Sequence, residues 1–169
     1  RETFADGIAF IPLQSVTPAE PIAPVLAVAI GCSLTGQVDA RDQVARFLRS
    51  EQKLLVMDNF EHLLGESPWL SELLAEAPDL RVLATSREAL NLSEEWRYPL
   101  AGLTMPADDA DDPGQSEAVR LFVERAQQVR PDFSFELERD GVLQLCRITE
   151  GLPLALELAA AWVTTLSCA

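Results

Sequence analysis

Short apolar runs alternate along the chain with segments whose apolar residues recur at helical spacing. The runs span residues 7–13, 53–57 and 81–85, and a continuous apolar run of this length is typical of a strand buried on both faces. A fourth strand is expected over residues 96–103. Short strands that alternate with helices favour an α/β fold with a parallel sheet of about four strands, whose crossovers are right-handed.

Capping and turn residues mark the ends of the helices between these strands. A helix is expected where polar capping residues precede an apolar periodic segment and where glycine or proline follows it. The signals are Ser15 or Thr17 and then Gly31 or Gly36 for the first helix, Asp39 for the second, and Ser67 and Pro78 for the third. Helices therefore connect the first three predicted strands.

The pattern changes after residue 104. Residues 105–115 are rich in Asp, Pro and Gly, and such a segment repels itself and cannot pack a core. Three helical patterns follow, and the last of them, from Pro153 onward, is apolar almost all round, so we expect it to be buried. The sequence thus predicts an α/β core over residues 1–104, an acidic linker over 105–115 and a small helical subdomain over 116–169.

Acidic residues outnumber basic ones by 27 to 13, which gives a formal net charge of −14. A surface this negative repels phosphate backbones and anionic membranes, so we expect contact with DNA only through another domain. The longest uncharged stretch, residues 21–38, contains two prolines and two glycines and predicts no membrane span. Cys32, Cys146 and Cys168 lie far apart among apolar residues, which predicts reduced, buried thiols in a cytoplasmic protein.

Candidate chemistry gathers at the ends of two predicted strands. Asp58, Asn59 and Glu61 follow the second apolar run, and Arg87 follows the third. Parallel α/β folds bind ligands at the carboxyl ends of their strands, where a carboxylate such as Asp58 suits Mg²⁺, directly or through water. Arg87 would neutralise phosphate charge in the same crevice.

Each of these residues also has a purely structural interpretation. Asp58 suits the cap of the next turn, and Asn59 and Glu61 are equally typical of a surface loop. Arg87 suits an ion pair with Glu88 or Asp58. The pattern alone leaves both interpretations open.

Other catalytic chemistries find little support. His62 is the only histidine and has no cysteine nearby, so a metal site is not expected there. No G-x-S-x-G elbow marks an activated nucleophile. Lys53 is the only lysine and is followed by leucine, so the chain contains no G-x-x-x-x-G-K-[ST] phosphate-binding loop.

Four segments together resemble one family. They lie in the family's order at residues 53–64, 80–92, 117–126 and 150–160. The family is the STAND-class signalling ATPases of bacterial LuxR-like and SARP-like multidomain transcriptional regulators, which are similar to the NB-ARC domains of plant resistance and apoptotic proteins. The resemblance covers nearly the whole chain and implies a P-loop NTPase-like core with a helical subdomain, and ATP or ADP with Mg²⁺ as cofactors.

The resemblance also implies roles for single residues. Asp58 matches the Walker B acid that holds Mg²⁺, and Arg87 matches the sensor of the nucleotide's terminal phosphate. Gly151 and Pro153 match the G-x-P motif, whose proline contacts adenine. From the pattern alone, the same motif is a helix stop followed by a helix start with proline at its first position.

Two departures from the family pattern matter. Asn59 stands where many relatives have a second acid, so the identity of the catalytic base is in question, and Glu61 is the candidate substitute. The family's first strand and P-loop should lie just upstream of Arg1. The chain itself is therefore expected to bind nucleotide weakly or not at all, and not to hydrolyse ATP.

The resemblance implies an ATP- or ADP-dependent switch that controls a DNA-binding domain elsewhere in a longer protein. One alternative is a nucleotide-independent protein-interaction module that docks through the helices from Ser116 onward. Another is a phosphoacceptor receiver domain, with Asp58 at one strand end and Thr85 or Ser86 at the next. Such a domain needs an acidic pair after its first strand and a lysine after its last. Residues 11–13 and 100–102 stand in those places and contain neither.

The missing family strand also bears on the sheet. In the family, the P-loop strand lies between the strands predicted here as the third and the fourth, so we expect a gap with two apolar edges. Because an unpaired apolar edge is an aggregation hazard, residues 98–103 should shift inward to pair with residues 82–84, or the edge at Val82 should pair with a second copy. The first outcome is favoured because the loop over residues 87–96 is long enough to allow the shift.

Overall fold

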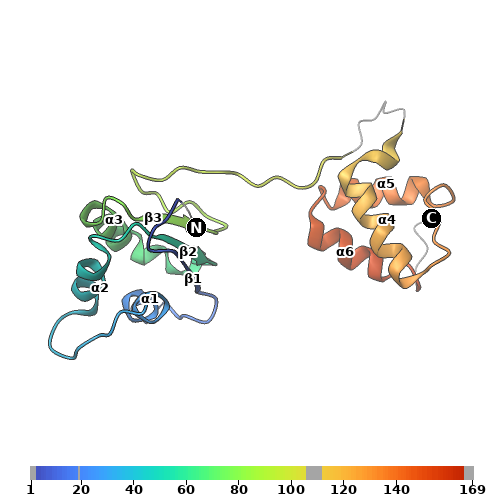
Figure 1. Ribbon diagram of the computed structural model, residues 1–169. Coiled ribbons are helices and arrows are strands. Elements are labelled where there is room, and N and C mark those ends of the chain that lie inside the picture. Colours follow the sequence, from blue (N-terminus) through green and yellow to red (C-terminus); the bar gives the residue numbers. More distant parts are fainter. Residues whose placement is uncertain (1–2, 19, 106–111, 166–169) are drawn as a thin grey trace. The chain divides into compact units, whose positions relative to one another are not determined.

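The computed structural model describes residues 3–18, 20–105 and 112–165 (Figure 1). The chain divides into two compact units, residues 1–97 and residues 98–169, called here the α/β unit and the helical unit. A parallel sheet with flanking helices confirms the predicted α/β fold class. Within the described residues, each helix is too short or too polar to cross a membrane.

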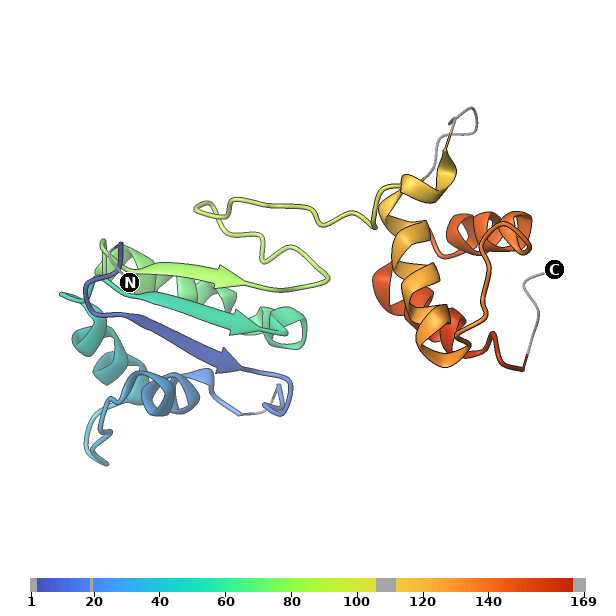
Figure 2. The ribbon, with the colours of Figure 1, turned by 45° about the vertical axis from the view of Figure 1, so that its right-hand side comes forward.

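The α/β unit contains a parallel sheet in the order β1-β2-β3, whose three arrows point the same way in Figure 2. Its strands are β1 (Ile8–Pro12), β2 (Leu54–Asp58) and β3 (Arg81–Ala84). Its helices are α1 (Ile22–Ile30), α2 (Ala40–Leu48), the 3-10 helix η1 (Phe60–Glu66) and α3 (Ser67–Glu76). The first three predicted strands are thus confirmed.

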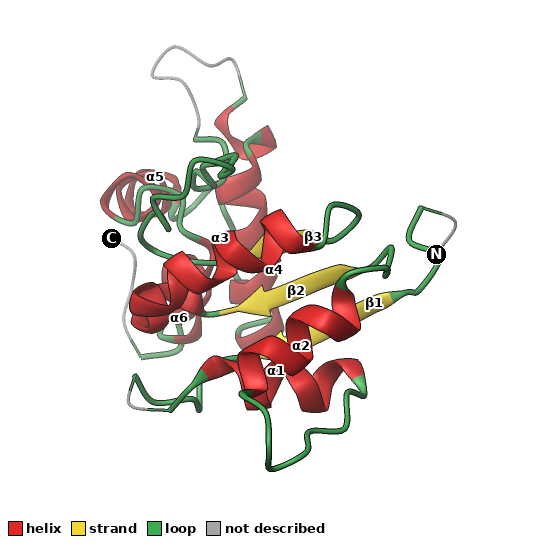
Figure 3. Cartoon of the chain, turned by 90° about the vertical axis from the view of Figure 1, so that its left-hand side faces the viewer, coloured by secondary structure: helices red, strands yellow, loops and turns green. Residues whose placement is uncertain are grey.

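Helices cover only one face of this sheet. Crossovers of one hand between strands added in one direction place their helices on the same side, and α1, α2 and α3 lie over one face in Figure 3. On that covered face, Ile11 and Leu55 are fully buried. On the other, called here the uncovered face, Phe10 is 60% exposed and Leu83 is 56% exposed.

Two predicted helix ends are confirmed by the capping geometry. Gly31 follows α1 with φ of 75°, a left-handed conformation that glycine adopts without steric cost. Asp39 precedes α2, and its side chain accepts a hydrogen bond from the Arg41 N–H at 2.7 Å. Each signal acts on neighbouring residues, so the helix ends could be predicted from the sequence alone.

Two helix starts differ from the prediction. Neither Ser15 nor Thr17 caps α1, which begins after Pro21. The Thr17 carbonyl instead accepts the Glu20 N–H at 2.9 Å in a separate turn. Ser67 is the first residue of α3 rather than its cap, because η1 runs directly into that helix.

The prediction of a fourth strand over residues 96–103 is wrong. The segment forms no strand, β3 remains an edge of the sheet, and Tyr98 and Leu100 are each 86% exposed. Closure of the sheet by residues 98–103 is therefore also wrong. The end of the segment is held elsewhere, because the Leu103 N–H donates to the Gly151 carbonyl at 2.8 Å. Pairing of the β3 edge with a second copy stays a prediction.

The helical unit packs three helices around a small apolar core. They are α4 (Glu117–Val129), α5 (Arg139–Ile148) and α6 (Pro153–Ala161), preceded by the 3-10 helix η2 (Pro113–Gln115). Phe122, Val142 and Leu156 are fully buried, and the Phe122 and Phe133 rings meet edge to face at 6.0 Å. Of the predicted acidic linker, residues 106–111 lie outside the described residues.

The prediction that α6 is buried on all sides is wrong. Leu156 and Ala160 are fully buried, but Leu154, Leu158 and Trp162 are each more than half exposed. In the described part of the chain, the main contacts of this helix are with α4 and, less extensively, with α5. Two neighbours on one side cannot cover a helix that is apolar all round, so one stripe of α6 stays exposed.

Both cysteines in the described residues are free thiols, as predicted. Cys146 is fully buried in the core of the helical unit, and this burial raises the pKa of its thiol to about 11. The prediction that Cys32 is buried is wrong: it lies after the end of α1 and is partly exposed. Cys168 lies outside the described residues.

Candidate functional site

The predicted acid at the end of β2 is held by a threonine at the end of β3. The Thr85 hydroxyl donates to Asp58 Oδ1 at 2.7 Å, and the Asn59 N–H donates to Thr85 Oγ1 at 2.9 Å. Among the described residues, Asp58 Oδ2 accepts no hydrogen bond. One carboxylate oxygen is therefore fixed by the protein, and the other is available to a cation or to water.

Backbone hydrogen bonds hold this edge of the sheet in place. The Thr85 N–H donates to the Met57 carbonyl at 2.9 Å, and the Phe60 N–H donates to the Thr85 carbonyl at 2.9 Å. Between them the chain turns at Asn59, whose φ is 70°. Asparagine tolerates this left-handed conformation better than most residues. The position of Asp58 is thus set by the sheet register and by the turn that follows it.

Glu61, three residues after Asp58, forms an ion pair with Arg87. Arg87 Nε donates to Glu61 Oε1 at 2.7 Å, and the Arg87 side chain is largely exposed. This hydrogen bond is the main reason why the pKa of the Glu61 carboxyl lies below its ordinary value. Of the structural partners expected for Arg87, neither Glu88 nor Asp58 is the one observed. The glutamate considered as a catalytic base is the partner instead.

His62 has a structural role in the α/β unit. Its Nε2 lies 3.0 Å from the Leu13 carbonyl oxygen and 2.8 Å from the Val16 carbonyl oxygen. Carbonyls only accept, so Nε2 carries the proton and ties η1 to the loop after β1. Within residues 3–18, 20–105 and 112–165, no three His, Cys, Asp or Glu side chains are grouped to hold a metal ion.

The donor set at Asp58 nevertheless fits the magnesium ion that the resemblance implies. Mg²⁺ in nucleotide sites keeps several waters and uses one or two carboxylates together with substrate phosphates. Asp58 supplies a carboxylate oxygen without a protein partner, and the Thr85 hydroxyl lies next to it. The site therefore fits a water-rich Mg²⁺ that arrives with phosphate, and not one held by protein ligands alone.

The remaining predicted site residues lie in the helical unit. The helix stop and restart are confirmed: α5 ends at Ile148, Gly151 has φ of 68°, and Pro153 is the first residue of α6. Gly151 is buried, whereas Pro153 is exposed. The structure thus brings Asp58, Asn59, Glu61 and Arg87 together in one unit and places Gly151 and Pro153 in the other.

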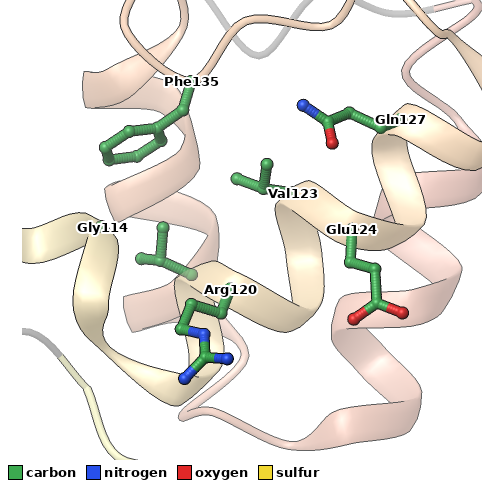
Figure 4. A pocket seen from close by; sticks show the side chains of 7 residues that line it. Gly114, Arg120, Val123, Glu124, Gln127 and Phe135 are labelled. Atoms are coloured by element: carbon green, nitrogen blue, oxygen red, sulfur yellow. The ribbon is translucent and has the colours of Figure 1, made fainter.

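A separate hollow of about 320 Å³ lies along α4 in the helical unit (Figure 4). It is lined by Gly114, Val119, Arg120, Val123, Glu124, Gln127 and Phe135. Val123 and Phe135 give it an apolar wall, and Arg120 and Glu124 point away from the phenyl ring. None of the predicted site residues lines it.

Sequence reasoning placed Thr85 near Asp58 only in the receiver alternative and gave it no role in a nucleotide site. The only signal was its position, directly after β3 and next to the strand that carries Asp58. Its hydrogen bond to Asp58 follows from the parallel register, in which Met57 pairs with Ala84.

No family model matches the chain. It is 36% identical over 166 residues to a Mycobacterium tuberculosis (strain H37Rv) protein named "Putative HTH-type transcriptional regulator". The aligned residues are 96% of this chain but only 18% of that protein. An uncharacterized protein of the same strain is 35% identical over 159 residues, which are 92% of this chain and 38% of that protein. The chain therefore has mycobacterial homologues named as transcriptional regulators and spans less than a fifth of their length.

Proposed function

We propose that the chain is the nucleotide-sensing part of a transcriptional regulator, in which ATP or ADP bound with Mg²⁺ sets the state of a DNA-binding domain of the same, longer protein. The observation that carries the proposal is the Asp58–Thr85 pair at the carboxyl edge of a parallel sheet. This edge is where open α/β sheets bind ligands. The names of the mycobacterial homologues support a role in transcription regulation.

The free edge of β3 and the uncovered face support a phosphate-binding loop at the same place. In the proposed arrangement, an additional strand pairs with the free edge of β3, and a helix after it leads back across the sheet to β1. A right-handed connection in that direction places its helix on the face opposite α1, α2 and α3. The helix would begin beside Asp58 and point its N-terminal N–H groups at phosphate there. One strand–helix unit would thus satisfy the open edge and cover Phe10 and Leu83.

In this proposal Asp58, Arg87 and Pro153 act through groups that the structure leaves accessible. Asp58 would hold Mg²⁺ through Oδ2, directly or through water, and the ion would supply positive charge against phosphate. Arg87 reads the terminal phosphate, and Pro153 contacts adenine. Asn59 cannot accept a proton as a carboxylate does, and Glu61 is a weak base while Arg87 lowers its pKa. We therefore expect slow hydrolysis, which suits a switch better than a turnover enzyme.

The Glu61–Arg87 pair gives the switch its two states. Arg87 donates to Glu61 in the structure described here. A terminal phosphate would compete with Glu61 for the exposed guanidinium, whereas ADP offers no such competitor. A ligand shifts a two-state equilibrium only through different contacts in the two states, and this exchange of partners supplies the difference.

The test is nucleotide binding and DNA binding by the whole regulator in which the chain occurs. Asp58→Asn should weaken ATP binding in the presence of Mg²⁺ and leave the weaker Mg²⁺-free binding unchanged. Arg87→Gln should reduce the preference for ATP over ADP, and Glu88→Gln, a neighbouring exposed side chain, is the matched control. Gel-shift assays should then show DNA binding that differs between ATP and ADP. Equal DNA binding with either nucleotide or none would contradict the switch.

The isolated chain provides a second test. It should not hydrolyse ATP and should bind it weakly or not at all, because a P-loop supplies most phosphate contacts through backbone N–H groups and one lysine. Calorimetry with ATP and Mg²⁺ checks this expectation. A dissociation constant in the low micromolar range would show that the described residues contain a phosphate site that we have not identified.

A nucleotide-independent protein-interaction module is the second candidate function. The observation that favours it is the exposed apolar stripe on α6, formed by Leu154, Leu158 and Trp162. Large exposed apolar patches mark interaction surfaces in soluble proteins. This candidate is preferred if the whole regulator binds no nucleotide but loses transcription activity when Leu158 is replaced by Gln.

A further inference from the structure

At Gly102 the chain passes so close to the backbone of the helical unit that only a glycine fits there. A Cβ atom added to Gly102 would overlap with the Glu150 carbonyl oxygen and lie 2.9 Å from the Gly151 carbonyl carbon. Both obstacles are backbone atoms, which cannot turn aside as a flexible side chain can. The backbone of Gly102 therefore contacts the backbone of the corner between α5 and α6.

The corner has the reciprocal requirement. Gly151 has φ of 68°, and a Cβ atom there would overlap with the Leu103 carbonyl oxygen. The Leu103 N–H donates to the Gly151 carbonyl at 2.8 Å. We call this contact between residues 102–103 and residues 150–151 the glycine seam.

The opposite side of the same segment is fixed to the start of α4. The Thr104 N–H and hydroxyl both donate to Glu117 Oε2, at 3.1 and 2.9 Å. The Ala118 N–H donates to the Thr104 carbonyl at 3.2 Å. These bonds lower the pKa of Glu117, so its carboxylate stays charged. Leu103 and Met105 also pack against the apolar core of the helical unit.

The four residues before the seam contrast with it. Residues 98–101 make no hydrogen bond within the described part of the chain, and Tyr98 and Leu100 are almost fully exposed. On the other side, Arg97 donates to Asn91 Oδ1 at 3.2 Å and pairs with Glu95. A fixed segment thus lies on each side of a short unbonded one.

We propose that Gly102 is a positioning residue for the corner at Gly151 and Pro153. The glycine seam joins the incoming chain to that corner, so residues 102–105 and the corner move as one body and the pivot lies at residues 98–101. The adenine-contacting proline is then placed by the path of the chain that enters the helical unit. This placement of adenine rests on the proposed function, whereas the seam and the pivot do not.

Hydrogen exchange of the chain without nucleotide tests the seam and the pivot. The Leu103 amide should be protected, and the amides of Leu100 and Ala101 should exchange close to the unfolded rate. Gly102→Ala and, from the other side, Gly151→Ala should each accelerate exchange at Leu103 at least tenfold while Phe122 in α4 stays protected. Gly36→Ala, at a glycine with open space around it, is the control. Unchanged exchange at Leu103, or protection of the Leu100 and Ala101 amides, would overturn the proposal.

Nucleotide binding by the whole regulator tests the positioning role. Gly102→Ala should weaken ATP binding at least tenfold and leave the affinity for tripolyphosphate, which has no adenine, unchanged. Equal losses for both ligands, or no loss while the seam is open by hydrogen exchange, would overturn the role. If the wild-type regulator binds neither ligand, the proposed function fails and the adenine role fails with it, while exchange at Leu103 still decides the seam.

Discussion

The two faces of the sheet carry similar residues but have different surroundings. Ile11 and Leu55 on the covered face are fully buried beneath the helices of the α/β unit. On the uncovered face, Phe10 in β1 and Leu83 in β3 are more than half exposed. In a parallel sheet both faces are normally covered, so the exposed apolar residues of the uncovered face are unusual for such a sheet.

The same contrast recurs on α6. Leu156 and Ala160 face the core of the helical unit, and Leu154, Leu158 and Trp162 face away from it. The apolar pattern of a segment therefore reports how much surface is to be buried in total. It does not report which part finds its partner within this chain, and that difference can be measured with matched pairs of substitutions.

The largest expected effect compares two leucines on opposite faces of neighbouring strands. Leu55→Ala should destabilise the α/β unit by about 2–5 kcal/mol through a cavity in a closed core, whereas Leu83→Ala should cost less than about 1 kcal/mol. Urea unfolding followed by the fluorescence of the buried Trp69, with Trp96 and Trp162 replaced by Phe, gives both values. Equal costs would show that the uncovered face is covered in solution.

A second pair makes the comparison within one helix. Leu156→Ala should destabilise the helical unit by about 2–3 kcal/mol, because a short helix at the end of a small unit can shift to fill part of the cavity. Leu158→Ala should cost well under about 1 kcal/mol. Far-UV circular dichroism during urea unfolding measures both. A large loss at Leu158 would mean that this stripe is buried, and sedimentation at two concentrations would show whether a second copy buries it.

The polar end of the uncovered face should show a smaller effect. Thr85→Val removes the hydroxyl that donates to Asp58 and accepts from the Asn59 N–H, and should cost about 1 kcal/mol. The control is Thr17→Val, at an exposed threonine whose hydroxyl has no hydrogen-bond partner in the described residues. If both variants unfold at the same urea concentration, the Thr85 hydrogen bonds do not hold the site.

Local signals explain what could be predicted. The apolar runs gave the first three strands, and Gly31 and Asp39 gave helix ends because each acts on its immediate neighbours. The fourth strand failed because a strand needs a partner. Residues 96–103 include Trp96 and Tyr98, which favour strands, but the segment pairs with no strand among the described residues. Pattern alone could not reveal this.

The sequence allowed us to predict which residues belong to the candidate site, but not which of them contact one another. Asp58 could be identified because it ends an apolar run. The hydroxyl that orients it could not, because Thr85 reaches Asp58 only through the register of two strands far apart in sequence. Likewise, Glu61 and Arg87 were both singled out, yet their pairing depends on how the chain turns after each strand.

The smallest expected effect concerns the pH dependence of that pair. The Arg87 hydrogen bond holds the pKa of Glu61 below its value in the unfolded chain. The pair therefore stabilises the fold above the unfolded pKa, and this contribution is lost as the pH falls through the folded pKa. Arg87→Gln should raise the pKa of Glu61 toward that of an ordinary glutamate, as measured by carbon NMR titration of its carboxyl group. Glu94 is the matched control, because its pKa is lowered by its own backbone and by Ser71 and should not move. A pKa of Glu61 that is unchanged in the variant would show that Arg87 does not hold the Glu61 carboxylate in solution.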